Sequence, residues 1–427
     1  MDVLLVVALL WLMVIFNWLR FKDFLYPALI QSFLWASAVT LFAIYQDMFY
    51  PISSTTWIVL ILGVITFSLG AHLATFRHFP YKNRNYVLIN EMPSNFVLCI
   101  LLLVMIIFLP FMCSEANRMS DFGPFKNTFK NLRYSMTHQG ESYGRLIYLV
   151  WLSFVTAGLI TMKMSSSKKD TINHKVKILA TLIVSIALLY AILMTGRGFI
   201  LFLLLILLGV ILILKTIHPA LAVMLAMVLG IIVFGSYGIA LDKGADSTLS
   251  LTENMFPLYQ SAIIYIVGSI PALDQVISSN IKIEMGLNTF LSVNSILNKL
   301  GLNLEIRPLV QPFTSVPFLI NTYTLYKPYI LDFGLLGPVI FQYCFGFLHG
   351  FIYRKASVFN PNPHYVLWYG ILLFPLVMQF SIELYLSWFK QWIVFLSFTL
   401  LIFTVSRLRI RKGHISVQKT FSGHYHR

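Results

Sequence analysis

The stretch that decides the fold class covers residues 176–214 and reads VKILATLIVSIALLYAILMTGRGFILFLLLILLGVILIL. It contains two apolar segments, Val176 to Met194 and Gly198 to Leu214, separated by a short polar turn. A helix of about 20 residues crosses the hydrocarbon core of a bilayer, and each segment is close to that length. The stretch therefore predicts two transmembrane helices joined by a tight turn.

The rest of the chain repeats this pattern. Of its 427 residues, 58% are hydrophobic and only 11% are charged, which is more apolar than a soluble domain. Nine further segments are predicted spans: Val3 to Leu19, Phe24 to Tyr45, Trp57 to Phe76, Phe96 to Cys113, Gly144 to Met164, Pro219 to Ile239, Tyr329 to Tyr353, Tyr365 to Phe380 and Trp388 to Val405. The expected fold is an all-α polytopic membrane protein with about eleven transmembrane helices.

Lysine and arginine residues predict the orientation. When the spans are threaded alternately, one face collects Arg20 and Lys22, the basic residues of 77–84 and 168–177, Arg354 and Lys355, and the tail after residue 406. Cytoplasmic loops carry such an excess. We therefore expect the amino terminus outside and the carboxyl terminus inside. The net charge of +15 is explained by orientation, so no nucleic-acid partner is expected.

The chain divides into four predicted parts. Residues 1–240 hold the first eight spans, 241–328 form a large extracytoplasmic loop, 329–406 hold the last three spans, and 407–427 form a basic cytoplasmic tail. Within the loop, the apolar segment from Ala262 to Leu273 is too short to span and is predicted to be interfacial or re-entrant. Apolar residues between Leu287 and Leu300 recur at helical spacing, which predicts a helix along the membrane surface.

The turn Thr195-Gly196-Arg197-Gly198 is the first candidate site. An arginine between two apolar segments is costly if it faces lipid, so Arg197 is expected to face a polar cavity or a headgroup. It also opens a helix, and helix amino ends favour anions. Two interpretations remain open: a turn whose arginine reaches lipid phosphates, and a phosphate clamp.

The second candidate site lies where the large loop re-enters the membrane. It comprises Asn321-Thr322-Tyr323-Thr324 and then Asp332-Phe333-Gly334 and Gly337. Amide, hydroxyl, phenol and carboxylate groups together can hydrogen-bond sugar hydroxyls. The alternative is an interfacial belt of Tyr323, Tyr326 and Tyr329, with Asp332 capping the span.

These features together resemble Wzy-type polymerases of O-antigen or other oligosaccharide repeat units. The resemblance is carried by the span layout, the large loop, Gly196-Arg197-Gly198, Asn321 to Thr324, Asp332 to Gly337 and Gly346 to Tyr353. Arg133 and Gly144 have the spacing Arg-x10-Gly, similar to a loop pattern of some Wzy proteins. A second copy is absent from the large loop, because Phe318 stands at that distance from Arg307.

The resemblance implies a multi-pass glycosyltransferase of GT-C type in the bacterial inner membrane. Such an enzyme moves a growing glycan from undecaprenyl pyrophosphate onto a lipid-linked repeat unit at the periplasmic face, as in lipopolysaccharide biosynthesis. Its implied partners are the lipid-linked oligosaccharide, the bilayer, a chain-length regulator and a flippase. The chain shows no metal-ligand spacing, and Cys99, Cys113 and Cys344 form no cluster, so neither a metal nor a cofactor is expected.

The residues suggest roles in this reaction. Pyrophosphate is already a good leaving group, so catalysis needs cations to hold its charge. Arginine binds phosphate oxygens with two parallel donors, which makes Arg197 the first candidate and Arg133, Arg145 and Arg307 the next. Asn321, Tyr323 and Thr324 are expected to bind sugar hydroxyls. The candidate bases are Asp332, Glu253, Asp242 and His138, and the sequence does not choose between them.

Two other functions are kept as alternatives. An O-antigen ligase uses the same donor, but its large loop usually carries a histidine, and residues 241–328 contain none. A non-enzymatic transporter or flippase is expected to hold ionisable residues deep within several spans. Here such residues cluster at span ends; His72 and His349 are exceptions that are expected to be packed helix residues.

Overall fold

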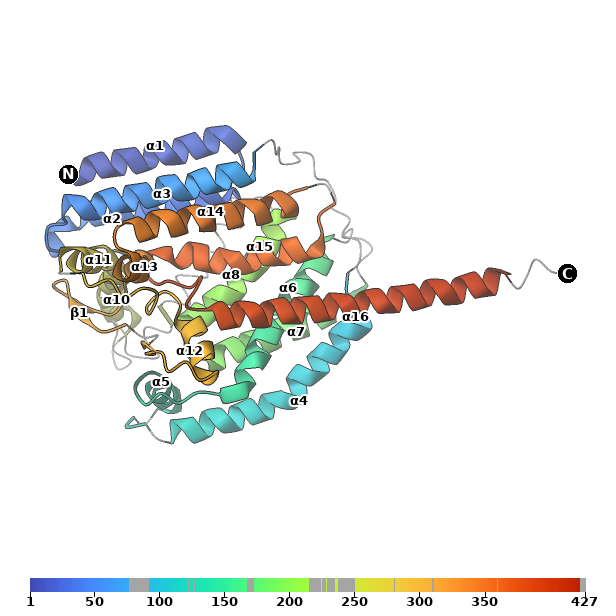
Figure 1. Ribbon diagram of the computed structural model, residues 1–427. Helices are drawn as coiled ribbons and strands as arrows, with labels where there is room; N and C mark the ends of the chain where they lie inside the picture. The colour runs from blue at the N-terminus through green and yellow to red at the C-terminus, as the bar shows by residue number, and fades with distance from the viewer. Residues whose placement is uncertain are drawn as a thin grey trace. The chain divides into compact units, whose positions relative to one another are not determined.

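The computed structural model consists almost entirely of helices, which confirms the all-α membrane class (Figure 1). It describes residues 1–76, 92–121, 123–125, 127–166, 173–214, 224, 228, 235–236, 250–279, 281–308, 311–358 and 360–422. For residues 407–422 it describes the backbone alone. Among these residues, ten helices are long and apolar enough to cross a membrane. The predicted span from Pro219 to Ile239 lies almost wholly outside the described residues.

The chain forms two compact units. Unit 1 comprises Met1–Lys82, His218–Val358 and Ile371–Lys390, and unit 2 comprises Asn83–Ile217, Phe359–Gly370 and Gln391–Arg427. The helices of unit 1 are α1 (Val3–Phe21), α2 (Pro27–Ile44), α3 (Ser54–Ala74), α10 (Leu251–Val267), α11 (Ser269–Ser278), α12 (Leu291–Lys299), α13 (Tyr326–Phe333) and α14 (Leu336–Ala356). Those of unit 2 are α4 (Asn95–Ser120), α5 (Thr128–His138), α6 (Ile147–Ser166), α7 (His174–Leu193) and α8 (Arg197–Ile213). Helices α15 (Pro363–Val377) and α16 (Phe389–Ser422) each begin in one unit and end in the other.

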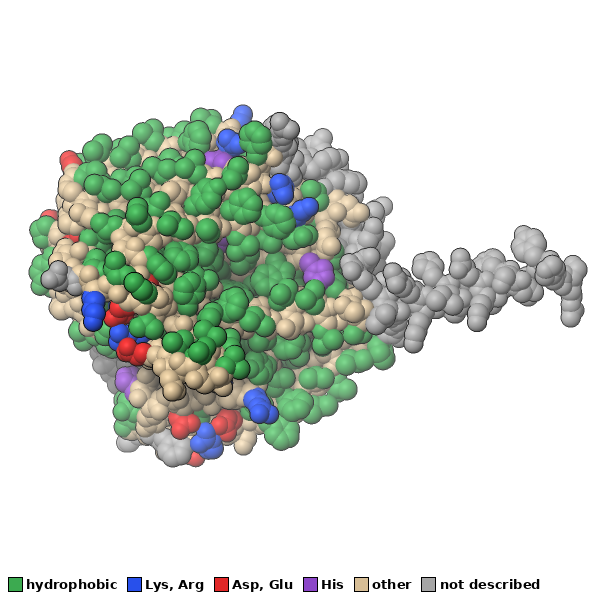
Figure 2. Space-filling model, in the orientation of Figure 1, with side chains coloured by type: hydrophobic (Ala, Val, Ile, Leu, Met, Phe, Trp, Pro, Cys, Tyr) green, Lys and Arg blue, Asp and Glu red, His purple; other side chains and the backbone are tan. Residues whose placement is uncertain are grey.

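The helix surfaces are apolar, as lipid contact requires. Figure 2 shows a face on which hydrophobic side chains predominate and few charged side chains interrupt them. On α1, for example, Leu4, Leu12 and Leu19 are all more than half exposed. A soluble protein rarely exposes so large a continuous apolar surface. The exposed leucines therefore fit a hydrocarbon environment.

Helices α3 and α14 form the closest pair in unit 1. Gly346 packs on the backbone of Phe67, and Gly350 packs on Ala71, so that a Cβ at Gly350 would lie 2.7 Å from the Ala71 carbonyl oxygen. Successive contacts involve higher residue numbers in both helices, so the two helices run parallel. Small residues four apart let helix backbones approach closely in membranes. The Gly346 to Tyr353 string of the sequence thus serves helix packing, and the parallel direction agrees with alternate threading of the predicted third and ninth spans.

Both intramembrane histidines are packed helix residues, as predicted. His72 Nδ1 lies 2.7 Å from the Tyr26 hydroxyl, and its Nε2 lies 2.9 Å from Asn17 Oδ1. His349 Nε2 lies 2.8 Å from the Tyr385 hydroxyl. Each imidazole is therefore satisfied by neighbouring helices or loops of unit 1.

Helices α10 and α11 differ from the expectation for the large loop. Together they cover a stretch, Thr252–Ser278, long and apolar enough to span, whereas the sequence predicted only a short apolar segment. However, Tyr259 in α10 contacts Tyr45 at the end of α2. Asp274 in α11 accepts hydrogen bonds from Ser53 and Thr56 at the start of α3, with oxygen–oxygen distances of 2.6 Å. The middles of both helices are thus attached to the α2–α3 turn (Figure 1), as in an interfacial segment lying across helix ends.

A short antiparallel hairpin follows α12 and was not predicted. Its strands are β1 (Thr314–Ser315) and β2 (Leu319–Ile320). The hairpin is held by α11, because Gln275 donates to the Ser315 carbonyl at 2.6 Å and Ala272 packs with Val316, Ile320 and Tyr323. This small core fixes the chain just before α13.

Candidate functional site

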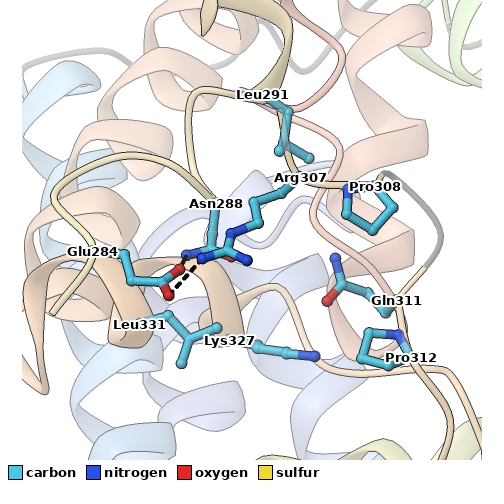
Figure 3. Close-up of a pocket in the computed structure, with 9 residues that line it drawn as sticks. All are labelled: Glu284, Asn288, Leu291, Arg307, Pro308, Gln311, Pro312, Lys327 and Leu331. Atoms are coloured by element: carbon cyan, nitrogen blue, oxygen red, sulfur yellow. Dashed lines mark hydrogen bonds and ion pairs between the residues drawn. The ribbon is translucent and has the colours of Figure 1, made fainter. Parts of the chain in front are cut away.

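A pocket of about 390 Å³ lies between three segments of unit 1 (Figure 3). The segment before α12 and its first residue contribute Glu284, Asn288 and Leu291; the segment before the hairpin contributes Arg307, Pro308, Gln311 and Pro312; and α13 contributes Lys327 and Leu331. All three segments belong to the part of the chain that the sequence places at or beside the extracytoplasmic loop. The pocket combines two cations, one carboxylate and two amides, a set that can bind both phosphate and hydroxyl groups.

Arg307 is tied to two carboxylates. Its guanidinium lies 2.8 Å from Glu284 Oε1 and 2.9 Å from Glu305 Oε1. The other oxygen of Glu284 accepts a hydrogen bond from the Asn288 amide at 2.7 Å. The charge of Arg307 is therefore balanced within the pocket wall, and these contacts link two segments 23 residues apart.

Lys327 is the second cation and is not among the candidate residues predicted from the sequence. Its residue surface is only 7% exposed, and its ammonium lies 3.4 Å from the centre of the Tyr323 ring. Within the described residues, no carboxylate lies close enough to form an ion pair with it. Burial lowers the pKa of the Lys327 ammonium to about 8. Within the part of the chain that the structure describes, the Tyr323 ring is thus the group that stabilises the charge of this buried amine.

The start of α13 explains why Lys327 points into the pocket. Thr324 Oγ1 accepts from the Tyr326 amide at 3.3 Å, and the Leu325 amide donates to the Gln379 carbonyl at 2.9 Å. The Tyr323 hydroxyl donates to the Pro312 carbonyl at 3.1 Å, which joins the pocket rim to the segment between β2 and α13. Thr324 and Tyr323 are therefore buried supports of the pocket. Asn321 is half-buried and does not line it.

Asp332 lies behind the pocket wall rather than at its mouth. The residue is fully buried, and its carboxylate accepts from the backbone amides of Asn288 at 3.1 Å and Thr289 at 2.6 Å. It also accepts from the Asn288 side chain at 2.8 Å. These donors satisfy the carboxylate and order the turn that carries Glu284 and Asn288. Its position makes Asp332 a support for the pocket.

The other candidate bases lie elsewhere. Glu253 is exposed and closes a capping box at the start of α10, where its carboxylate accepts from the Ser250 amide at 2.8 Å. His138 is exposed at the end of α5 in unit 2. Asp242 lies outside the described residues. Of the described candidate bases, Asp332 and Glu253 are in the unit that holds the pocket, and neither lines it.

The other three candidate arginines, Arg133, Arg145 and Arg197, belong to unit 2. Arg197 is the first residue of α8 and is half-buried, and the left-handed residue of its turn is Thr195, at φ 51°, rather than either glycine. The Thr195 hydroxyl approaches Met136 Sδ at 3.7 Å in α5, and the Tyr143 hydroxyl donates to the Leu193 carbonyl at 2.7 Å. The α7–α8 connection therefore contacts α5, the helix that carries Arg133. It also contacts Tyr143, which directly precedes the 3-10 turn Gly144–Leu146 that carries Arg145. The segments that carry Arg133, Arg145 and Arg197 thus lie close together within unit 2.

The alternative interpretation of Tyr323, Tyr326 and Tyr329 was an interfacial aromatic belt, but these side chains are buried in the structure. Tyr326 and Tyr329 are fully buried, and Tyr323 is 6% exposed. The Tyr329 hydroxyl donates to Glu383 Oε1 at 2.8 Å, and Glu383 also accepts from the backbone amides of residues 385–387. Burial in the protein, rather than contact with headgroups, accounts for these tyrosines.

One signal in the sequence pointed to Lys327. It stands two residues before the outer end of the predicted span from Tyr329 to Tyr353, where the orientation rule expects few basic residues. Glu284 gave no comparable signal, because its ion pair with Arg307 depends on tertiary structure. Comparison of the chain with protein-family models, with curated proteins and with solved structures found no match.

Proposed function

We propose that this protein is a glycosyltransferase that polymerises undecaprenyl-pyrophosphate-linked repeat units into O-antigen or a related surface polysaccharide at the periplasmic face of the bacterial inner membrane. The observation that carries the proposal is the pocket itself. It places Arg307 and Lys327 beside a carboxylate and two amides, in the loop region predicted to face outward. Cations suit the pyrophosphate leaving group, and the carboxylate and amides suit sugar hydroxyls.

The reaction needs one bond made and one bond broken. The acceptor hydroxyl oxygen attacks the anomeric carbon of the growing chain, and the bond from that carbon to the pyrophosphate oxygen breaks with its electron pair. The pyrophosphate leaves as an anion next to the cations. Glu284 is the carboxylate that lines the described pocket, so it accepts the proton of the attacking hydroxyl.

Two glutamates allow a matched test. Both pair with Arg307. Glu284 lines the described pocket, whereas Glu305 does not line it and its side chain is 59% exposed. In a strain that lacks the gene, Glu284→Gln should give single-repeat product at normal protein abundance, and Glu305→Gln should restore the polymer ladder. An unchanged ladder with Glu284→Gln would remove this residue from the reaction.

The gene deletion itself separates the alternative functions. Loss of a polymerase leaves single repeat units on the final acceptor. Loss of a flippase leaves no repeat units there, and loss of a ligase leaves long polymer still linked to polyprenyl pyrophosphate. A deletion strain that makes full-length, transferred polymer would refute the proposed function.

A further inference from the structure

The two cations of the pocket differ in how their charges are balanced. Arg307 forms ion pairs with Glu284 and Glu305. Lys327 has no ion-pair partner among the described residues, although it is far more buried than Arg307. A buried charge without a partner is costly, and proteins keep such groups mainly where a ligand balances them.

The surroundings of the Lys327 ammonium suit an anion. In Figure 3 the side chain extends toward Gln311 and Pro312, away from the Glu284–Arg307 pair. Among the residues that the structure describes, the charged and titratable groups around it are Tyr323, Arg307 and Glu284. The Tyr323 ring stabilises the charged amine without neutralising it. An incoming anion would therefore gain a full positive charge at this end of the pocket.

We propose that Lys327, rather than Arg307, is the main anion-binding residue of this pocket, and that its ligand is a phosphate or pyrophosphate ester. The inference deepens the proposed function and rests on it for the pyrophosphate class. The positive charge of Arg307 is already balanced by two carboxylates. Arg307 instead positions Glu284, and its buried Nε, which has no hydrogen-bond partner among the described residues, can donate one additional bond.

The proposal also predicts how a glycosyl phosphate lies in the pocket. The phosphate end faces Lys327 and Gln311, and the sugar hydroxyls face Glu284 and Asn288. A carboxylate would repel a phosphate but accepts hydrogen bonds from hydroxyls readily. The two ends of the pocket thus match the two chemical parts of a lipid-linked sugar.

Binding of inorganic pyrophosphate to the purified full-length protein in detergent micelles tests the assignment. Lys327→Met should weaken binding by tenfold or more, because one charge-assisted contact is worth about that factor. Lys327→Arg should keep most of the affinity, and Lys299→Met, which removes an exposed lysine of the same unit, should leave it unchanged.

Two results would overturn the inference: unchanged pyrophosphate affinity in Lys327→Met, or no binding to the wild-type protein. Competition then identifies the source of the phosphate. Farnesyl pyrophosphate competing far better than phosphatidylglycerol indicates a lipid-linked pyrophosphate. Equal competition indicates a lipid headgroup, which supports the Lys327 site and contradicts the proposed function. A normal polymer ladder with Lys327→Met, together with unchanged affinity, rejects the inference and leaves the proposed function standing.

Discussion

Replacing Lys327 with methionine is expected to stabilise the ligand-free protein at neutral pH. Burial lowers the pKa of this ammonium from 10.5 to about 8. At 1.36 kcal/mol per pKa unit, burying the charged form costs on the order of 3 kcal/mol. Losing the contact with the Tyr323 ring offsets up to about 2 kcal/mol of the gain. Methionine has a similar length and no charge, so we expect a net gain of about 1 to 2 kcal/mol.

The gain depends on pH with a definite sign. Below pH 8 the amine is protonated in both the folded and the unfolded protein, so the full cost of burial is present. Between pH 8 and 10.5 only the unfolded protein keeps the proton, and the wild-type protein becomes more stable as the pH rises. The difference between Lys327→Met and the wild type should therefore be largest at pH 6.5 and should shrink by pH 10.

Thermal unfolding of the purified protein in detergent, followed by tryptophan fluorescence at pH 6.5, 8 and 10, measures this difference. Lys299→Met is the matched control, because that lysine is exposed, and it should show no such pH dependence. Two results would refute the view that Lys327 is a buried charge without an ion-pair partner among the described residues. One is a Lys327→Met protein less stable than the wild type at pH 6.5; the other is a stability difference that is equal at pH 6.5 and pH 10.

Four further outcomes are expected. Asp332→Asn should destabilise the protein by about 2 kcal/mol and lower the pyrophosphate affinity of the pocket, because the new amide donor faces the donors of Asn288. An unchanged unfolding temperature would argue against this supporting role of Asp332. Gly346→Ala should lower the unfolding temperature, since its Cβ would collide with α3, whereas Gly235→Ala, where no described atom lies within 4 Å of the added Cβ, should not. The same unfolding scan compares them. If Arg197 clamps pyrophosphate, Arg197→Lys should retain partial polymerisation and Arg197→Ala none, whereas full ladders from Arg197→Lys point to headgroup anchoring. Reporter fusions in the turn after α11 and in the carboxyl-terminal tail should report opposite sides of the membrane, and the same side for both would contradict the predicted orientation.

The helices were predictable because hydropathy is a local property. The apolar segments around residues 176–214 appear as α7 and α8 within a few residues of the predicted ends. The hairpin was not predictable, because two residues per strand carry no pattern and its position depends on Gln275 of α11. Pocket chemistry was predictable only in part. Arg307 stood out by residue type, whereas the burial of Lys327 depends on tertiary structure, which brings its ammonium onto the Tyr323 ring and into one pocket with Gln311 and Pro312.

Figure 1 shows α13 leading directly into α14, and α14 is the helix that packs so closely on α3. Gly63 of α3 also lies against Tyr326, and a Cβ there would come within 2.7 Å of the Tyr326 ring carbon Cζ. One wall of the pocket, with Lys327 next to Tyr326, is thus built on a rigid helix pair, whereas the opposite wall is loop. Loops tolerate change far better than close-packed helices. Under the proposed function, residues 284–291 are therefore the place to alter sugar preference, because changes in this loop segment leave Lys327 and its helix pair in place.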